Sequence, residues 1–403
     1  MSTSIVWFRQ DLRLHDNEAL TEAIRIADEL IPVYIFDIDP GRWSVSRVNF
    51  LIESVTDLRK QLRAAGTDLI VRVGKPDNIL YQMALETKSQ WVYCNRERTH
   101  DEVNVQDRLE QQLWTIGREL RYTRGKMLYY TSDLPFPVTH CPDSFIAFRK
   151  EVEPILSVRQ PLPSPVTIPP LVTGLEPGEI PTLEAILPGR LVVMNPGFAG
   201  GETAGLKALN EVGISQLQPD YPLVGSSLSP WLAMGCLSPK KVYYQSLSMP
   251  SGGEEIRQNL VYRDYLRLMG KKYGDQIFCK SGIKARKIEF TKNEEAFTNW
   301  KSGRTGVEII DAAMHQLNST GWMPDVLRKI SANYLIKVLQ LDWRLGAAYF
   351  ESALIDYDPC SNWVSWLNLA GLGPDNREDR IIHFDLAGKK LDPDGAYVRM
   401  WNS

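Results

Sequence analysis

The sequence predicts two domains of different class: an α/β domain with a doubly wound parallel sheet, followed by an all-α domain. Up to residue 128, short apolar runs alternate with amphipathic stretches, whereas only helical periodicity follows Ala204. The chain has 403 residues, which is long for one core because domains usually contain roughly 100–200 residues. We expect the α/β domain at 1–128, a linker at 129–200 and the helical domain at 201–403.

The α/β domain is predicted from five apolar runs, the fifth weaker than the others, with helical periodicity between them. Strands that alternate with helices form βαβ units, and such units build a parallel sheet. The expected strands are 5–8, 31–36, 69–73, 91–94 and 120–123. The expected helices are 17–28, 46–65, 77–86 and 101–114.

The segment that follows is rich in proline. Residues 131–200 hold thirteen of the 25 prolines, which excludes a sustained helix and predicts an extended linker on the surface. Beyond it, the 3.6-residue periodicity predicts an all-α domain without strands. Its expected helices are 254–273, 306–317, 326–339, 346–354 and 360–370.

The composition bounds the function. Hydrophobic content of 43% and charged content of 24% are ordinary for a globular protein. Five scattered cysteines without a CxxC pair argue against zinc, iron–sulfur clusters and disulfides, and favour a reducing compartment such as the cytoplasm. We expect no leader peptide before Ile5 and no metal site. No apolar run approaches the ~18 residues that span a membrane.

Two local patterns leave alternatives open. The first βα turn, WFRQDLRLHDN, lacks GxGxxG and so disfavours a nicotinamide oxidoreductase. From Arg257 to Lys292 there are ten Lys or Arg and three Asp or Glu. Such a basic stripe can follow nucleic-acid phosphates, or it can be a solvated helix face.

Several polar residues stand where a ligand could use them. Small hydroxyl residues from Ser226 to Ser229 open a helix, where they could bind phosphate or simply cap the helix before Pro230. Asp325 in a first helical turn and Asp358 before Pro359 can likewise be structural.

Four motifs resemble the photolyase/cryptochrome family, most closely its DASH branch: WFR-DLRLHDN, GGETAG, LSPWLA-GCLSP and DYDPCSNW. The resemblance extends from Ile5 to Trp401. It implies FAD in the helical domain and a blue-light-driven chemistry, either the splitting of pyrimidine dimers in DNA or light sensing with little repair. A light-independent flavoprotein of the same fold is the third alternative.

The resemblance also implies a set of site residues. The serine loop is similar to the family loop that holds the flavin pyrophosphate, and Asn362 corresponds to the residue that faces the reactive ring nitrogen. A neutral amide there can bond to that nitrogen in either protonation state. The residues implied in FAD binding are Ser226, Ser227, Leu228, Ser229, Asn259, Arg263, Trp322, Asp325, Arg328, Asp356, Asp358 and Asn362.

Trp366 and Trp343 match the inner two members of the family's tryptophan relay, which delivers electrons to the flavin. The outer member falls at Phe290, which cannot be oxidised comparably. Other aromatic residues could complete a different route, namely Trp363, Trp322, Trp300 or a nearby tyrosine.

The chain departs from the family pattern where a lesion would bind. Asn259 stands where Glu is usual, Tyr262 where Trp is usual, and Asn368 where an aromatic residue is usual. These changes disfavour dimer repair more than flavin binding. Because flipping a base from a single strand avoids unpairing, we expect single-stranded DNA to be preferred.

One acidic residue of the first domain resembles an antenna position. Glu97 matches the residue that binds a folate (methenyltetrahydrofolate) in DASH proteins, although a carboxylate at a helix start is the alternative. We also expect a monomer.

Overall fold

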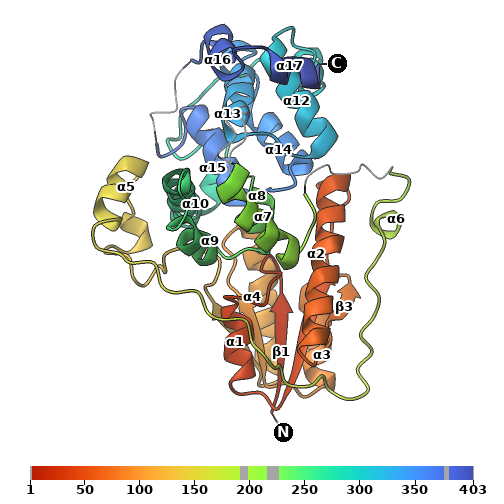
Figure 1. Cartoon of the computed structure of the whole chain (residues 1–403). Coiled ribbons are helices and arrows are strands. Elements are labelled where there is room, and N and C mark those ends of the chain that lie inside the picture. The colour runs from red at the N-terminus through yellow and green to blue at the C-terminus, as the bar shows by residue number, and fades with distance from the viewer. Residues whose placement is uncertain (1, 191–197, 216–226, 376–380, 403) are drawn as a thin grey trace.

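The computed structural model describes residues 2–190, 198–215, 227–375 and 381–402. Its first part is a five-stranded parallel sheet in the order β3-β2-β1-β4-β5 (Figure 1). The predicted class of this domain is therefore confirmed. The strands are β1 Thr3–Phe8, β2 Glu29–Phe36, β3 Ile70–Val73, β4 Trp91–Asn95 and β5 Glu119–Thr123.

Helices cover both faces of this sheet. Val6 and Phe8 of β1 belong to the core cluster that includes residues of the first two helices, whereas Ile5 and Trp7 belong to the cluster of the next two. This alternation follows from the two-residue period of a strand. The helices are α1 Glu18–Ile24, α2 Val45–Ala64, α3 Pro76–Glu86 and α4 His100–Thr115.

The first helix is shorter than predicted. It begins after Asn17, whose side chain accepts a hydrogen bond from the Leu20 amide, but it ends at Ile24 instead of residue 28. Asp28 accepts a hydrogen bond from the Ser2 amide at the start of β1. This contact directs the chain into β2 before another helical turn can form.

The proline-rich linker runs along the α/β domain and bonds to it through its backbone. The amides of Leu30 and Val71 donate to the carbonyls of Pro170 and Pro177. Two short helices interrupt the linker, α5 Phe145–Val152 and α6 Leu183–Ile186. The prediction of no sustained helix holds for long helices only, because α5 runs for two turns and buries Phe148.

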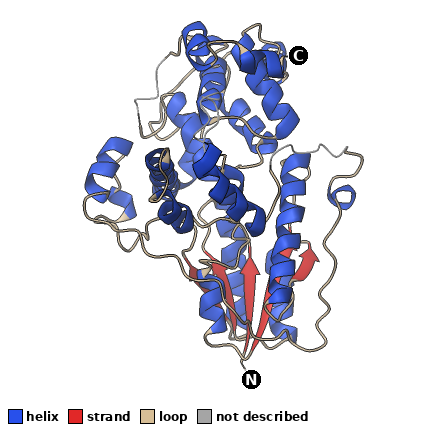
Figure 2. Cartoon of the chain, in the orientation of Figure 1, coloured by secondary structure: helices blue, strands red, loops and turns tan. Residues whose placement is uncertain are grey.

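The second domain is helical, as Figure 2 shows, and no strand follows residue 123 in the described ranges. The helix predicted at 326–339 is not α-helical over its full length. The α-helix α13 ends at Asn333, and Tyr334–Val338 forms a π-helical turn. The helices are α7 Glu202–Ser215, α8 Ser229–Ala233, α9 Pro239–Ser246, α10 Gly253–Tyr273, α11 Glu294–Lys301, α12 Glu308–Thr320, α13 Asp325–Asn333, α14 Trp343–Ala353, α15 Pro359–Leu369, α16 Phe384–Leu391 and α17 Ala396–Trp401.

The turn after β1 joins the two domains. Arg13 is buried and donates to the carbonyl oxygens of Gly235 and Gly125, both at 2.8 Å. Glu202 of α7 accepts hydrogen bonds from the amides of Leu14 and His15. The WFRQDLRLHDN motif therefore serves as an interdomain joint built from buried polar groups that are bonded to each other.

Glycine is required at one point of this joint. Gly235 has a φ of 67°, and a Cβ there would lie 2.1 Å from the carbonyl oxygen of Gln10. Only glycine allows the two domains to approach so closely. Among the described helices, none is both long and apolar enough to cross a membrane.

Candidate functional site

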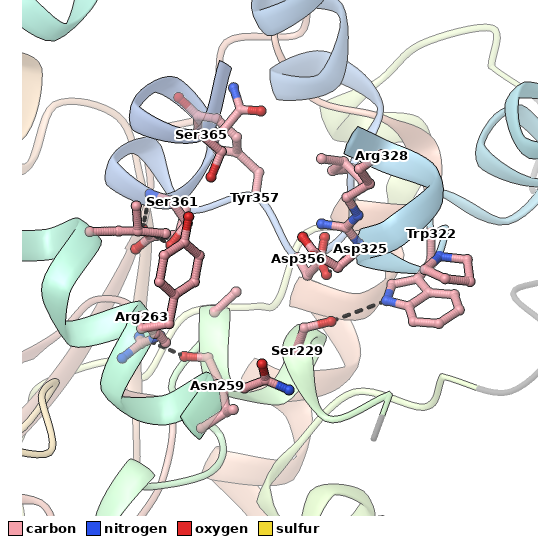
Figure 3. Close-up of a pocket in the computed structure, with 18 of the residues that line it drawn as sticks. Ser229, Asn259, Arg263, Trp322, Asp325, Arg328, Asp356, Tyr357, Ser361 and Ser365 are labelled. Atoms are coloured by element: carbon pink, nitrogen blue, oxygen red, sulfur yellow. Dashed lines mark hydrogen bonds and ion pairs between the residues drawn. The ribbon is translucent and has the colours of Figure 1, made fainter. Parts of the chain in front are cut away.

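A cavity of about 280 Å³ lies inside the helical domain, between α8, α10, α13 and α15 (Figure 3). The structure brings most of the sequence-predicted site residues to its wall. Ser226 lies outside the described residues, and Trp343 does not line the cavity. The predicted residues on the wall are Ser227, Leu228, Ser229, Asn259, Tyr262, Arg263, Trp322, Asp325, Arg328, Asp356, Asp358, Asn362 and Trp366.

The serine loop forms one end of the cavity. Ser227 has a φ of 46°, a left-handed conformation that is uncommon outside glycine. Ser229 begins α8, and its hydroxyl oxygen accepts a hydrogen bond from the indole N–H of Trp322 at 3.1 Å. The Ser229 hydroxyl proton can therefore still be donated to an anionic oxygen in the cavity.

An ion pair forms the neighbouring part of the wall. The Arg328 guanidinium donates to Asp356 Oδ2 at 2.7 Å and to the Met323 carbonyl at 2.9 Å. Asp356 Oδ1 is buried without a hydrogen-bond partner among the described residues. An unpaired buried acceptor costs free energy, so this oxygen fits a ligand that donates hydroxyl groups.

Asp358 holds the start of α15. Its Oδ1 accepts from the amide and the hydroxyl of Ser361, both at 2.8 Å, and its Oδ2 pairs with Arg267. Burial alone would raise the pKa of Asp358, but the charges of Arg267 and Arg263 and the Ser361 bonds lower it to about 2. The N-cap alternative is therefore confirmed, and the lowered pKa keeps this carboxylate charged at neutral pH.

Asn362 follows one turn later on the cavity face of α15. Its side-chain N–H donates to the carbonyl oxygen of Ala347 at 3.0 Å, and the residue is buried. This bond fixes the orientation of the amide. Its Oδ1 atom is left as a hydrogen-bond acceptor for a ligand in the cavity.

The aromatic residues around Trp366 form two groups. Trp366 packs edge-on against Phe350 and Trp300, with ring centroids 5.1 and 6.2 Å away. Trp343 packs edge-on against Trp363 at 5.8 Å. Trp343 and Trp366 are both buried. The two groups approach each other at α14, where the Trp366 ring packs against Gly346, one turn after Trp343.

The rim of the cavity is less basic than the sequence stripe indicated. Arg263 reaches the wall, but its guanidinium donates to the carbonyls of Lys126 and Leu232. Lys272 donates to Asp143. Part of the 257–292 stripe therefore stabilises the fold, and the stripe is not one solvated face.

The residues expected beside a lesion lie in different places. Asn259 is exposed at the cavity rim, and Tyr262 is half-buried there, 4.9 Å from the ring of Phe145. Asn368, by contrast, is only 1% exposed and does not line the cavity. Its Oδ1 accepts from the Asp375 amide, so the expected contact position is wrong for this chain.

Sequence reasoning missed further wall residues. Ser361 and Ser365 line the cavity from α15, and Ser365 lies one turn after Asn362, so helical spacing could have found it. Tyr357 and Lys329 also line it. Tyr357 stands between Asp356 and Asp358 in the DYDPCSNW motif, so the motif could have indicated it, whereas no pattern around Lys329 distinguishes that residue from an ordinary surface position.

A second cleft, of about 1150 Å³, lies beside the carboxyl ends of β1 and β2 and reaches the helical domain. Trp7, Tyr34 and Glu97 line it. Two buried atoms at this cleft, Arg9 Nη1 and Arg47 Nε, have no hydrogen-bond partner among the described residues. Such donors suit an anionic ligand.

Glu97 itself is held by the protein. It is 2% exposed, pairs with Lys126 and lies 3.6 Å from Arg267. Burial would raise the pKa of Glu97, but these charges and that of Arg9 lower it. In the described ranges, no group of three or more His, Cys, Asp or Glu side chains could hold a metal ion.

Comparisons with known proteins agree with this geometry. A family model described as "DNA photolyase" matches residues 4–166, and one described as "FAD binding domain of DNA photolyase" matches residues 256–402. Cryptochrome DASH of Gloeobacter violaceus is 35% identical over 99% of this chain and 85% of its own length.

Solved structures give the same result. A cryptochrome from Synechocystis sp. PCC6803 superposes with a TM-score of 0.92 at 34% identity, over 100% of this chain and 88% of its own. An archaeal photolyase from Sulfolobus tokodaii, described as containing two FAD molecules, gives a TM-score of 0.85 at 29% identity, over 99% of this chain and 90% of its own.

Asp358→Asn tests the charge at the start of α15. Removing one partner of a buried ion pair should lower the free energy of unfolding by about 3 kcal/mol at neutral pH. The pKa of Asp358 is about 2 when folded and 3.8 normally, so its stabilisation is complete above about pH 4 and is lost towards pH 2. The difference in the free energy of unfolding between variant and parent, measured with denaturant, should therefore decrease as the pH is lowered.

Asp342→Asn is the matched control, because Asp342 also caps a helix and pairs with an arginine, Arg344, but at a more exposed site. Its cost should stay below about 1 kcal/mol. A pH-independent cost of Asp358→Asn would contradict the charge argument.

Proposed function

Because the chain belongs to the photolyase/cryptochrome family, we propose that it is a blue-light-driven flavoprotein that splits pyrimidine dimers in DNA. The observation that supports this most is the cavity, in which the serine loop, Arg328 with Asp356, and Asn362 face one space. When bound, FAD supplies the light-absorbing group and the electron that opens the cyclobutane ring.

The residues present fit FAD. The hydroxyls of Ser227 and Ser229 would bind its phosphates, and the unpaired Asp356 Oδ1 would accept from its ribityl hydroxyls. Arg328 would hold Asp356 in place. One N–H of the Asn362 amide donates to the Ala347 carbonyl, which orients the amide, and Asn362 Oδ1 would accept from a protonated ring nitrogen.

A DNA substrate is supported by the rim. Asn259 and Tyr262 could contact a base that is flipped into the cavity. Exposed cations of the 257–292 stripe could contact its phosphates, at Lys271, Lys280, Arg286, Lys287 and Lys292. Asn259 is a neutral amide, so it would read a pyrimidine edge more weakly than a carboxylate. We therefore propose single-stranded DNA as the better substrate.

The second candidate is a blue-light receptor in which the redox state of the flavin is read by a partner. The neutral Asn259 at the rim and the buried Asn368 favour this function, since neither offers the usual contact to a dimer. A light-independent flavoprotein would leave the packed aromatic groups around Trp366 without a role.

We also propose that the second cleft holds an antenna chromophore, a folate such as methenyltetrahydrofolate. Trp7 and Tyr34 offer aromatic walls, and the unpaired nitrogens of Arg9 and Arg47 suit the carboxylates of a folate. Glu97 would contribute to this folate site only indirectly, because its carboxylate is already paired with Lys126 and Arg267. We further propose that the protein acts as a monomer. Its five free cysteines support a reducing compartment, for which we propose the cytoplasm.

The purified parent protein should carry about one FAD per chain.

Arg328→Ala should reduce the affinity for FAD. Loss of a charge-assisted bond costs about 1.5–3 kcal/mol, which corresponds to roughly tenfold to a hundredfold weaker binding. Fluorescence titration of the apoprotein with FAD measures this. Arg344→Ala is the control, because Arg344 pairs with Asp342 away from the cavity. Equal affinities of both variants would refute the assigned wall.

Asn259→Glu should increase dimer repair. Light-dependent loss of dimers is followed chromatographically with single-stranded and duplex oligonucleotides. The parent protein should act better on single strands, because flipping from a duplex costs a few kcal/mol more. Asn259→Gln keeps the neutral amide and should not gain. Equal repair of both substrates by the parent, or no gain with Glu, would favour the receptor function.

Incubation with methenyltetrahydrofolate tests the antenna. After gel filtration and denaturation, the protein should release folate together with FAD. The Arg9→Ala variant should retain less folate at unchanged FAD content, because Arg9 lines the second cleft and not the cavity. Release of FAD alone, or of a second flavin, would reject the folate.

A further inference from the structure

Trp363 lies between the cavity and the second cleft. It belongs to α15 directly after Asn362, whose side chain lines the cavity, while Trp363 itself lines the second cleft and is half-buried. Its neighbour Tyr357 lines both spaces. An indole in this position connects the interior of the helical domain with the solvent of the cleft.

Trp363 also contacts the predicted relay. Its ring centroid is 5.8 Å from that of Trp343, in an edge-on arrangement, and 5.1 Å from that of Phe278. Phe290, where the family's outer tryptophan would stand, lies 5.4 Å from the Lys280 ammonium. A phenyl ring is hard to oxidise, and a nearby cation makes it harder. Trp363 is thus the oxidisable ring that contacts Trp343.

The surroundings of Trp363 stabilise a positive charge. Its indole N–H donates to Glu351 Oε2 at 3.1 Å and to the Tyr357 hydroxyl oxygen at 3.2 Å. The Glu351 side chain is 8% exposed and also pairs with Arg42. An oxidised indole is a cation with an acidic N–H, so a carboxylate bonded to that N–H lowers the energy of the cation and can accept its proton.

The alternative partner of Trp366 lacks such a group. Trp300 is fully buried, and its indole N–H donates to the Ser331 carbonyl. Tyr349, which contacts Trp300 at 5.8 Å, donates to Asn318 and to the Lys301 carbonyl. Burial raises the pKa of Tyr349 to about 12. Neither ring has a carboxylate to hold the charge or the proton.

We propose that Trp363, with Glu351 as its charge partner, is the outer electron donor of the relay in place of Phe290. This inference rests on the proposed light-driven function. One electron leaves Trp363 for Trp343, its ring neighbour. It continues to Trp366, which packs against Gly346 one turn along α14 from Trp343, and from there to oxidised FAD. Trp363 is left as an indole radical cation whose N–H proton is shared with Glu351. A soluble thiol that enters the second cleft then gives one electron to Trp363 and its proton to solvent, and two of the resulting thiyl radicals combine to a disulfide.

The test is transient absorption after a blue laser flash on FAD-loaded protein. In Trp363→Phe the tryptophan radical should recombine at least an order of magnitude faster than in the parent, at equal FAD content. Trp300→Phe is the matched control, because Trp300 is another tryptophan in aromatic contact with the relay, and it should behave like the parent. Glu351→Gln should keep the electron transfer but slow deprotonation of the radical and weaken its dependence on pH.

The outcomes separate the two proposals. An unchanged radical lifetime in Trp363→Phe, or a shortened one in Trp300→Phe, would overturn the role of Trp363 while leaving the light-driven function intact. A parent protein that binds FAD but forms no radical after the flash would reject the function as well. Tyrosine at position 363 remains oxidisable, so Trp363→Tyr should restore a long-lived radical with a tyrosyl spectrum.

Discussion

Arg267 is buried between two carboxylates that come from different domains. It pairs with Asp358 at the start of α15 and lies 3.6 Å from Glu97 in the loop after β4. Lys126 pairs with the same Glu97, so two cations face two anions with almost no water. Burial disfavours the charged guanidinium, yet these carboxylates raise the pKa of Arg267. Removing any member would leave a buried charge uncompensated, at a cost of several kcal/mol.

The cluster of Lys126, Glu97, Arg267 and Asp358 positions the helix that lines both the cavity and the second cleft. Asp358 caps α15, so the cluster fixes the helix that carries Asn362 to the cavity and Trp363 to the second cleft. The joint around Arg13 fixes the same two domains at a separate point. The cavity and the second cleft therefore share α15 as a common wall.

Much of the fold could be predicted from the sequence because the signals are local. Alternation of apolar runs predicted all five strands. The family resemblance implied that Asn362 and Trp366 would lie beside a flavin, and both line the cavity. The Arg267 cluster could not be predicted, since its members are far apart in the chain and meet only after packing. The position of Asn368 could not be predicted for the same reason: it is buried by packing, and its Oδ1 accepts from the Asp375 amide. The role of Glu351 likewise exists only once α14 lies beside α15.

The central claim is that the cavity holds a flavin that light can reduce. The most direct measurement is the visible absorption spectrum of the purified, FAD-loaded protein in the dark and during blue illumination with a thiol present. The account predicts a bound oxidised flavin spectrum that bleaches in light and returns in air. A protein that takes up no FAD, or whose flavin spectrum does not change under light, would contradict it.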